Sequence, residues 1–260
     1  MPENVNVTIL YEDNHVICAV KPRGVLSQAD GTDAPDILTL LKKYIKTKYA
    51  KPGDVYLGLV HRLDRPVGGV MVVARTSKAA GRLSEQIRER AIKKAYYAVL
   101  DGAPEKASGL LEHRINKDRR VNIVSVSEIG ATGKSGKEYA ALEYEIIALA
   151  GQHALAHIDL LTGRPHQIRA QFAFIGHPVI GDRKYGGIVF GRHFARMNTE
   201  QAPNATGISN IGPITQYPAL WAASLGFLHP VSHKPLVISA PPPYEYPWDL
   251  FEHKLYAKIT

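Results

Sequence analysis

The chain has 260 residues, of which 45% are hydrophobic, and it carries a formal net charge of +8. This length and apolar content predict a globular protein whose core forms one large domain or two lobes. The positive charge favours a polyanionic partner, although it does not select nucleic acid among such partners. The single cysteine, Cys18, excludes an intrachain disulfide, and its apolar neighbours indicate a buried, inert thiol.

The sequence contains no apolar run near the roughly 18 residues that a membrane-spanning helix needs. Its first residues lack a basic leader followed by an apolar core, which a secretory signal requires. Together with the lone cysteine, this pattern predicts a soluble, cytoplasmic protein in a reducing compartment.

Strands and helices alternate along the first third of the chain without a regular repeat. Alternating or continuous apolar positions predict strands, whereas apolar positions three or four residues apart predict helices. The expected elements are a hairpin of residues 7–10 and 15–20, a helix at 35–45 with Pro35 near its first turn, strands at 56–60 and 69–74, and a helix from Ser77 to about residue 91. Ser77 is expected to cap this last helix, with Leu83 and Ile87 on its inner face.

The rest of the chain is expected to be richer in strands. Strands are expected at 94–100, 121–126, 139–149, 153–160, 220–227 and 236–240, with a short helix at 165–175 that Gly176 ends. Two polar stretches, 127–137 and 186–217, are expected to be loops. Because no composition break separates these elements, we expect a single domain over residues 1–260.

His61-Arg62-Leu63-Asp64, followed by Arg65, is the most informative stretch, since it places a carboxylate between two basic side chains in a loop between apolar strands. An acid beside an arginine is by itself most often a surface ion pair. A short loop between two buried strands, however, is a rigid platform for a functional side chain. If the chain has a nucleophile, Asp64 is the candidate.

Two other patterns fail as sites. Gly133-Lys134-Ser135 would need a glycine five residues before Gly133 to form a phosphate-binding loop, and Glu128 stands there. His153 and His157 are four residues apart in an expected strand, where this spacing keeps them well separated, and no acid completes a ligand set. We therefore expect no metal site.

The tetrapeptide and the Gly-containing apolar run after it resemble the signature of the RluA family of pseudouridine synthases. Further motifs match that family in the same order over roughly residues 8–240, which is far more specific than any one motif. They are Lys21-Pro22-Arg23-Gly24, Lys94-Ala95-Tyr96, Gly163-Arg164-Pro165-His166-Gln167-Ile168-Arg169, Gly176-His177-Pro178-Val179-Ile180-Gly181-Asp182 and Phe227-Leu228-His229-Pro230.

The chain departs from the family pattern at two places. Val67-Gly68-Gly69 stands where the family often has Thr-Ser-Gly, and Leu220-Trp221-Ala222 stands where Leu-His-Ala is usual. Neither departure touches Asp64.

The resemblance implies an α+β pseudouridine synthase fold, with a mixed, largely antiparallel sheet in two lobes around a central catalytic cleft. It also implies that the separate N-terminal RNA-binding module of some relatives is missing, because the first expected strand begins almost at once. We expect a monomer that needs no cofactor.

The resemblance implies Asp64 as the catalytic carboxylate, which either attacks C1′ of the target nucleotide or helps to remove a ribose proton. For either role Asp64 must be ionised, and Arg169 supplies the nearby cation in the family's arrangement. On the expected helix, Arg169 lies three residues after His166, so both would share one face and bind substrate. Without the resemblance, Arg169 would be read as a surface arginine of an amphipathic helix.

The other expected substrate-binding residues are Tyr96, Arg62 and Lys21. Tyr96 would stack on the extracted uracil, with cross-strand packing as the alternative. Arg62 would enter the gap left in the RNA by the extruded base, with a phosphate contact or a solvated charge as the alternative. Lys21 could track phosphates, together with the basic stretch formed by Arg88, Arg90, Lys93 and Lys94, although a solvated helix face is the more common role for any one of them.

These residues predict a pseudouridine synthase acting on a stem–loop of structured tRNA or rRNA. A non-catalytic RNA-binding protein or RNA chaperone on the same scaffold is the alternative, but it gives Asp64 no role. A glycosidase would need a second carboxylate near Asp64. Asp182 is the only acid in the motifs that could serve, and its Gly-Asp-x-x-Tyr-Gly setting indicates a turn.

Overall fold

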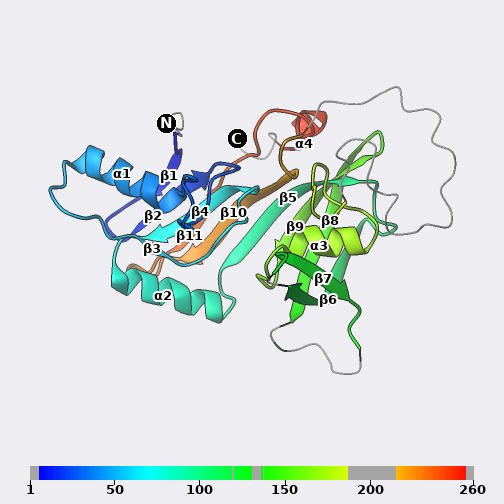
Figure 1. The fold of residues 1–260 in the computed structure, drawn as a ribbon, viewed down its shortest axis with the longest axis horizontal. Coiled ribbons are helices and arrows are strands. Elements are labelled where there is room, and N and C mark those ends of the chain that lie inside the picture. The colour runs from blue at the N-terminus through cyan, green and yellow to red at the C-terminus, as the bar shows by residue number, and fades with distance from the viewer. Residues whose placement is uncertain (1–5, 119, 131–135, 137, 187–214, 256–260) are drawn as a thin grey trace. The chain divides into compact units, whose positions relative to one another are not determined.

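The computed structural model describes residues 6–118, 120–130, 136, 138–186 and 215–255, and the chain divides into two compact units (Figure 1). The first unit comprises Met1–Tyr96 and Trp221–Pro242, and the second comprises Tyr97–Leu220 and Pro243–Thr260. Strands dominate both units and helices are few, which confirms the expected α+β class. Among the described residues, no helix has the length and apolar character needed to cross a membrane.

The first unit is built on a mixed sheet. Its strands are β1 (Ile9–Glu12), β2 (Val16–Lys21), β3 (Gly58–Leu59), β4 (Gly68–Ala74), β10 (Leu220–Leu228) and β11 (Pro235–Ser239). The expected hairpin of β1 and β2 is confirmed, and β2 continues antiparallel onto β4. β10 pairs with β4 in parallel and with β11 antiparallel. β3 has only two residues, so the expected strand at 56–60 is much shorter than predicted.

The core of the first unit lies around β4, all seven residues of which are buried. Helix α1 (Ile37–Tyr49) buries Ile37, Leu41 and Ile45, the apolar positions of its inner face. Helix α2 (Ser77–Arg88) packs Ala79 and Leu83 into the cluster that contains β4. Cys18 is fully buried there, and burial raises the pKa of its thiol to about 12, which confirms the expected inert thiol.

The expected cap of α2 at Ser77 is wrong by one residue. The preceding residue, Thr76, has extended backbone angles, and its hydroxyl accepts the amide of Ala79 at 3.2 Å. Asp36 caps α1 in the same way by accepting the amide of Thr39 at 3.1 Å. Each cap satisfies one of the amide groups that a helix leaves unpaired in its first turn.

Strand β4 begins with two glycines, Gly68 and Gly69, and β10 packs closely against both. Gly68 pairs with Trp221, and Gly69 pairs with Ala222. A Cβ atom on Gly68 would lie 2.5 Å from Cζ3 of the Trp221 indole, and one on Gly69 would meet the backbone of Ala222. Gly69 also has a φ of +124°, a backbone region that other residues rarely adopt. Gly68 therefore does not accept a side chain while Trp221 is present, and the backbone of Ala222 excludes a side chain at Gly69.

The second unit is built on a sheet with the strand order β5-β9-β8-β6-β7, and its β6–β7, β6–β8 and β8–β9 pairs are antiparallel. The strands are β5 (Lys93–Asp101), whose first residues belong to the first unit, β6 (Ser108–Asp118), β7 (Ile123–Ser127), β8 (Tyr139–Ala150) and β9 (His153–Leu160). β6 is not among the expected strands. The Gly133-Lys134-Ser135 stretch and most of the expected loop at 186–217 lie outside the described residues.

Helix α3 (Gln167–Phe174) lies against this sheet. Its Ala170 joins a buried cluster with Ile115, Val124 and Ala140, and its Phe172 ring meets the Tyr144 ring edge to face. A short 3-10 helix (Asp249–Phe251) and α4 (Glu252–Leu255) complete the unit. Packing against β6, β7 and β8 thus fixes α3, which presents Arg169.

Candidate active site

Asp64 lies in the loop from β3 to β4, and the first anchor of this loop is His61. The pairing of β3 with β4 ends at Leu59 and Val73. The next amide of β4 that points toward β3 belongs to Val72, and it has no strand partner there. The Nε2 atom of His61 accepts this amide at 3.1 Å. Burial and the charge of Lys94 lower the pKa of His61 far below its ordinary value, which keeps Nε2 an acceptor. A neutral imidazole thereby replaces the missing strand.

The second anchor lies directly before Asp64. The hydroxyl of Ser27 donates to the carbonyl oxygen of Leu63 at 2.8 Å and accepts the amide of Leu63 at 3.0 Å. Both side chains are buried, so water does not compete for these bonds. The backbone orientation of Leu63 therefore follows that of the Ser27 segment.

The third anchor lies directly after Asp64. Gly24 donates its amide to the Arg65 carbonyl at 2.9 Å, and the Arg65 side chain donates back to the Gly24 carbonyl at 3.0 Å. The amide of Val67 closes a turn onto the Asp64 carbonyl at 3.0 Å. With both neighbours of Asp64 fixed in this way, its carboxylate starts from a defined position, as a catalytic group requires.

Lys21 is the interior support of this loop. Its ammonium donates to the carbonyl oxygens of Pro22 at 3.0 Å, Val25 at 2.7 Å and Arg65 at 3.2 Å. The side chain is fully buried, so the expectation that Lys21 tracks RNA phosphates is wrong. Burial lowers the pKa of Lys21 to about 7, whereas the negative charge of nearby Asp64 opposes that shift. Lys21 thus ties residues 22–25 to Arg65, the residue that follows Asp64.

Tyr96 is the aromatic residue that the structure brings near Asp64. The ring is buried, with 8% of the residue exposed, and both burial and the charge of Asp64 raise the pKa of its phenol. Tyr96 therefore stays protonated at neutral pH. Its neighbour Tyr97 contacts the His157 ring instead, at 5.6 Å between centroids. Arg62 is exposed, which fits both of the roles that the sequence left open.

Arg169 and Asp182 form a buried ion pair in the second unit. Nε of Arg169 lies 2.5 Å from Oδ2 of Asp182, and a second nitrogen lies 2.7 Å from Oδ1. Only 5% of Arg169 is exposed, so the surface-arginine interpretation is wrong. Asp182 is fully buried and also accepts the amides of Lys184 and Tyr185, which confirms the turn expected there. An acid held in this way is a poor proton donor, which weighs against the glycosidase alternative.

His166 does not share a helix face with Arg169, contrary to expectation. It precedes α3 with a φ of +53°, and the helix begins at Gln167. Instead both side chains meet Tyr185, which is not among the predicted site residues. The Tyr185 hydroxyl lies 2.7 Å from Nδ1 of His166, and the Arg169 guanidinium lies 5.3 Å from the centre of the Tyr185 ring.

Tyr185 is held in turn by β7, since its hydroxyl accepts the amide of Val124 at 2.9 Å. The Gly-Asp-x-x-Tyr-Gly motif contains Tyr185, but the motif by itself indicates only a turn. The predicted site residues thus form two groups: Asp64, Arg62, Lys21 and Tyr96 in the first unit, and His166 and Arg169 in the second. The pairing of Asp64 with Arg169 stays a prediction.

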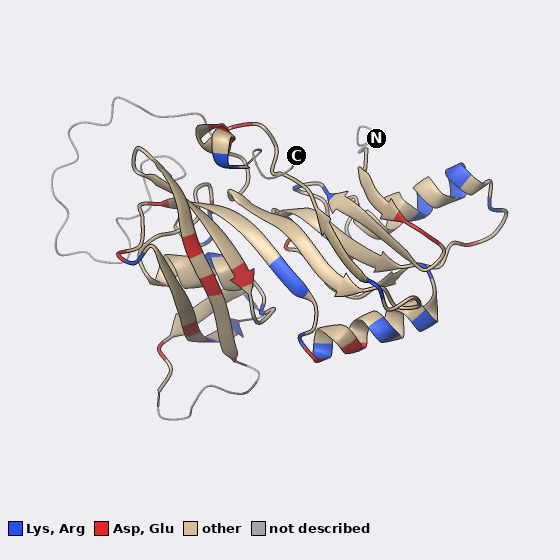
Figure 2. Cartoon of the chain, turned by 180° about the vertical axis from the view of Figure 1, so that it is seen from behind, with Lys and Arg blue, Asp and Glu red and all other residues tan. Residues whose placement is uncertain are grey.

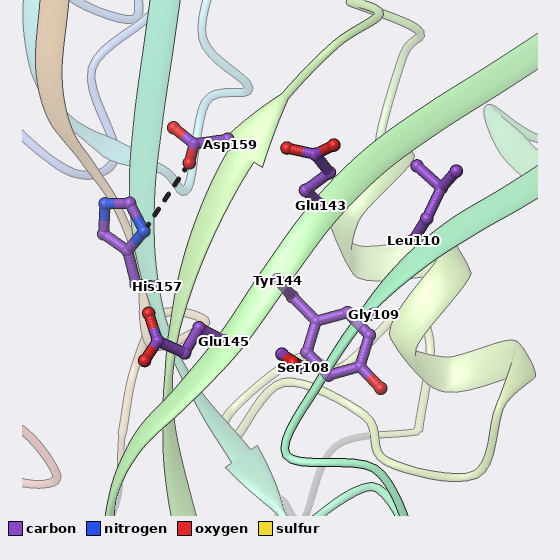
Figure 3. A pocket seen from close by; sticks show the side chains of 8 residues that line it. All are labelled: Ser108, Gly109, Leu110, Glu143, Tyr144, Glu145, His157 and Asp159. Atoms are coloured by element: carbon purple, nitrogen blue, oxygen red, sulfur yellow. Dashed lines mark ion pairs between the residues drawn. The ribbon is translucent and has the colours of Figure 1, made fainter.

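A pocket of about 350 Å³ lies elsewhere, on one face of β6, β8 and β9 in the second unit (Figure 3). Glu143 stands directly opposite Asp159 across the β8–β9 pair, and Glu145 stands opposite His157. Of these side chains, His157 and Asp159 form an ion pair at 3.9 Å. Three carboxylates would repel RNA phosphates, so this pocket is not a site for the expected substrate. No group of metal-ligating side chains is present in the described part of the chain.

Comparison with known sequences points to one family. The sequence model described as RNA pseudouridylate synthase matches residues 15–174. "Ribosomal large subunit pseudouridine synthase D" of Xylella fastidiosa is 34% identical, over 94% of this chain and 68% of that protein. "RNA pseudouridine synthase 2, chloroplastic" of Oryza sativa is 30% identical, over 94% of this chain and 64% of that protein. The chain thus spans about two thirds of the length of these relatives.

Solved structures share the fold. Human RNA Pseudouridylate Synthase Domain Containing 4 matches with a TM-score of 0.70 at 21% identity, covering 95% of this chain and 92% of that chain. Human RNA Pseudouridylate Synthase Domain Containing 1 matches with a TM-score of 0.66 at 24% identity, covering 94% and 87%. The expected pseudouridine synthase fold is therefore confirmed, and the chain belongs to the RluA family of RNA pseudouridylate synthases.

Proposed function

We propose that the protein is an isomerase that converts uridines of structured rRNA or tRNA to pseudouridine, with Asp64 as its catalytic carboxylate. The observation that carries this proposal is the loop around Asp64. His61, Ser27 and Lys21 fix its backbone on both sides of the acid. Ribosomal RNA is the favoured substrate, because relatives such as that of Xylella fastidiosa are named for the large ribosomal subunit.

The reaction exchanges one bond of the nucleotide for another. The bond from C1′ to N1 of uracil breaks, the base turns, and C5 joins C1′. The proton that leaves C5 is balanced by the proton that N1 gains, so no oxidant or energy source is consumed. Asp64 either attacks C1′ or helps to remove a ribose proton, and both roles require its ionised form.

Access to the nucleotide requires that uridine leave the RNA stack, at a cost of a few kcal/mol for unstacking. Arg62, exposed in the same loop as Asp64, would fill the space that the base vacates. The Tyr96 ring, close to Asp64, would stack on the extruded uracil. We propose that the protein acts as a monomer in the cytoplasm, which sedimentation with RNA and cell fractionation would test.

A non-catalytic RNA-binding protein would not need this loop. A carboxylate on a surface that faces RNA weakens binding, because it repels phosphates. Anchoring such a carboxylate through both neighbouring residues is useful only when its position matters, as it does in catalysis.

The proposal is tested with RNA tritiated at uracil C5, from which the wild-type protein should release label. Asp64→Asn should abolish release and still bind RNA. Asp54→Asn, which removes a fully exposed acid in the same unit, should behave as the wild type. Release by Asp64→Asn at the wild-type rate would remove Asp64 from the mechanism. An absence of release from any RNA, with tighter binding by Asp64→Asn, would instead favour the chaperone alternative.

A further inference from the structure

Helix α1 carries a strong and unbalanced charge. Between residues 37 and 53 the chain has five lysines and no acid. The inner face of the helix is apolar and buried, whereas Lys42, Lys43 and Lys46 are exposed on the outer side. Figure 2 shows basic bands along α1 and no acidic one.

Among the described residues, only one lysine of this helix forms a close ion pair within the fold. Lys48 binds the carboxylate of Glu12 at 2.7 Å. Lys46 has only Asp54 within reach, at 4.0 Å, and that acid is fully exposed, so the pair contributes little. For Lys42 and Lys43, no ion pair is found with any described residue. These two lysines and Lys46 therefore have no evident structural task.

The spacing of these three lysines also works against the helix. Lys42 and Lys46 are four residues apart, and Lys43 and Lys46 are three apart, so their like charges face one another. A charge pattern that destabilises the element bearing it is evidence of selection for something other than folding.

Helix α2 shows the contrasting case. It also carries several cations, but Glu85 lies three residues after Arg82 and balances it. Arg82 is in addition bound to the Pro230 carbonyl at 2.5 Å, so it has a structural task. The pocket face of the second unit carries the opposite charge, with Glu143, Glu145 and Asp159. Within the described chain, α1 is thus the helix with a purely basic outer side.

We propose that Lys42, Lys43 and Lys46 form an RNA-binding surface, the α1 lysine face, which holds the phosphate backbone of the substrate away from the target nucleotide. The identity of the polyanion as RNA rests on the proposed function. Lysines act as point charges on phosphates and read no base sequence, which suits a surface that positions RNA without selecting it.

An anionic membrane fits this face less well. Helices that lie on membranes insert a free apolar face, whereas the apolar residues Ile37, Leu41 and Ile45 of α1 are already buried in the core. Only charge attraction between the lysines and the lipid head groups would then remain, because no apolar face of α1 is free to enter the bilayer.

The experiment replaces all three lysines together, as Lys42→Gln, Lys43→Gln and Lys46→Gln in the full chain. Binding of a labelled ribosomal RNA stem–loop is measured by anisotropy over a range of salt concentrations. Each lost phosphate contact lowers the slope of log K against log salt by about 0.7 to 0.9. We expect the slope to fall by about 2 and the affinity at low salt to fall at least about tenfold.

The matched control removes the same charge elsewhere, as Lys106→Gln, Lys234→Gln and Lys254→Gln, all at exposed positions. Its affinity should stay within about twofold of the wild type, since these lysines do not share one helix face. Thermal unfolding of the α1 variant should occur at the wild-type temperature or slightly above it, because like-charge repulsion is removed.

Activity separates this proposal from the proposed function. In the α1 variant the rise in KM for tritiated RNA should exceed the fall in kcat, whereas Asp64→Asn should lose kcat and keep its affinity. Equal losses of affinity in both lysine variants would show an effect of net charge alone and overturn the α1 lysine face. Unchanged RNA binding with lost binding to phosphatidylserine vesicles would assign the face to membranes. If the wild type modifies no RNA, the binding comparison still decides whether the face exists.

Discussion

The hydroxyl of Ser27 bonds both the carbonyl oxygen and the amide of Leu63, the residue that precedes Asp64. A single side chain therefore fixes a peptide segment that no strand holds. Ser27 lies 36 positions away in sequence, in the turn that Lys21 also supports. The position of the carboxylate thus depends on a segment that contains no reacting group.

Ser27→Ala should reduce turnover without weakening RNA binding. The variant leaves two buried backbone groups unpaired, which costs about 1–3 kcal/mol and loosens the loop. We expect kcat to fall and the RNA dissociation constant to stay unchanged, measured by tritium release and anisotropy. Thr76→Ala, which removes the cap of α2 at a similar cost in stability, is the control and should keep kcat. Equal loss of kcat in both variants would show that lower stability alone explains the effect.

Tyr96→Ala should lose the stacking that holds the extruded base. A base stacked on an aromatic ring is worth about 1–3 kcal/mol, so kcat/KM should fall by about fivefold to 150-fold. Tyr97→Ala deletes the same volume at the adjacent position, whose ring contacts His157, and should change kcat/KM far less. A larger effect at Tyr97 would assign both rings to packing.

Asp182→Asn should strongly destabilise the second unit. It leaves the buried Arg169 cation without its partner, and loss of one member of a buried pair costs about 3–5 kcal/mol. Urea unfolding would measure this loss. Glu138→Gln, which breaks the more exposed pair with Arg114, should cost less than about 1 kcal/mol. Similar costs for the two variants would contradict the structural importance of the Arg169–Asp182 pair.

Glu12→Gln should weaken the dependence of the free energy of unfolding on pH in the acid range. Burial opposes ionisation of Glu12, but hydrogen bonds from Lys48, Tyr49 and Tyr44 outweigh it and lower its pKa below 4.5. Because the pKa is lower in the folded state, this stabilisation is complete above pH 4.5 and is lost as pH falls through the folded value.

The free energy of unfolding of the wild type should therefore exceed that of Glu12→Gln near pH 6, and the difference should shrink toward about pH 3. Chemical denaturation at each pH gives this difference. Glu105→Gln, at an exposed position, should show no such pH dependence. A difference that stays constant with pH would mean that the ionised form of Glu12 is not the stabilising species.

Local sequence patterns were sufficient for most elements and for the loop that carries Asp64, whereas the role of Asp64 stays a prediction. Continuous apolar runs predicted β2 and β4, because a strand buried on both faces has no polar side. β6 was missed because its charged residues show no alternation. Its place in the sheet comes from pairing with β7 and β8, which a local pattern does not contain.

The site could be predicted only in part, for the same reason. Motifs named Asp64 and Arg169, but Asp182 as the partner of Arg169 depends on a contact between α3 and the turn after it. The role of Lys21 was mistaken because composition does not distinguish a lysine that binds phosphates from one that binds three carbonyls. His166 was placed on the helix because sequence spacing does not reveal a left-handed residue at its start.

The contact between Gly68 and Trp221 couples the two departures from the family pattern, because the residue at one position limits which residue fits at the other. A serine at position 68 would clash with the indole, and a smaller residue at position 221 would leave a void beside Gly68 and free the Ala240 carbonyl that the indole nitrogen now bonds. Each exchange is therefore unfavourable until the other has occurred. A lineage with the usual Ser and His would reach Gly68 and Trp221 through a less stable intermediate, and the order that acquires the glycine first avoids the clash with the indole. The residues at the two positions should therefore vary together, and relatives that carry the tryptophan should also carry the glycine.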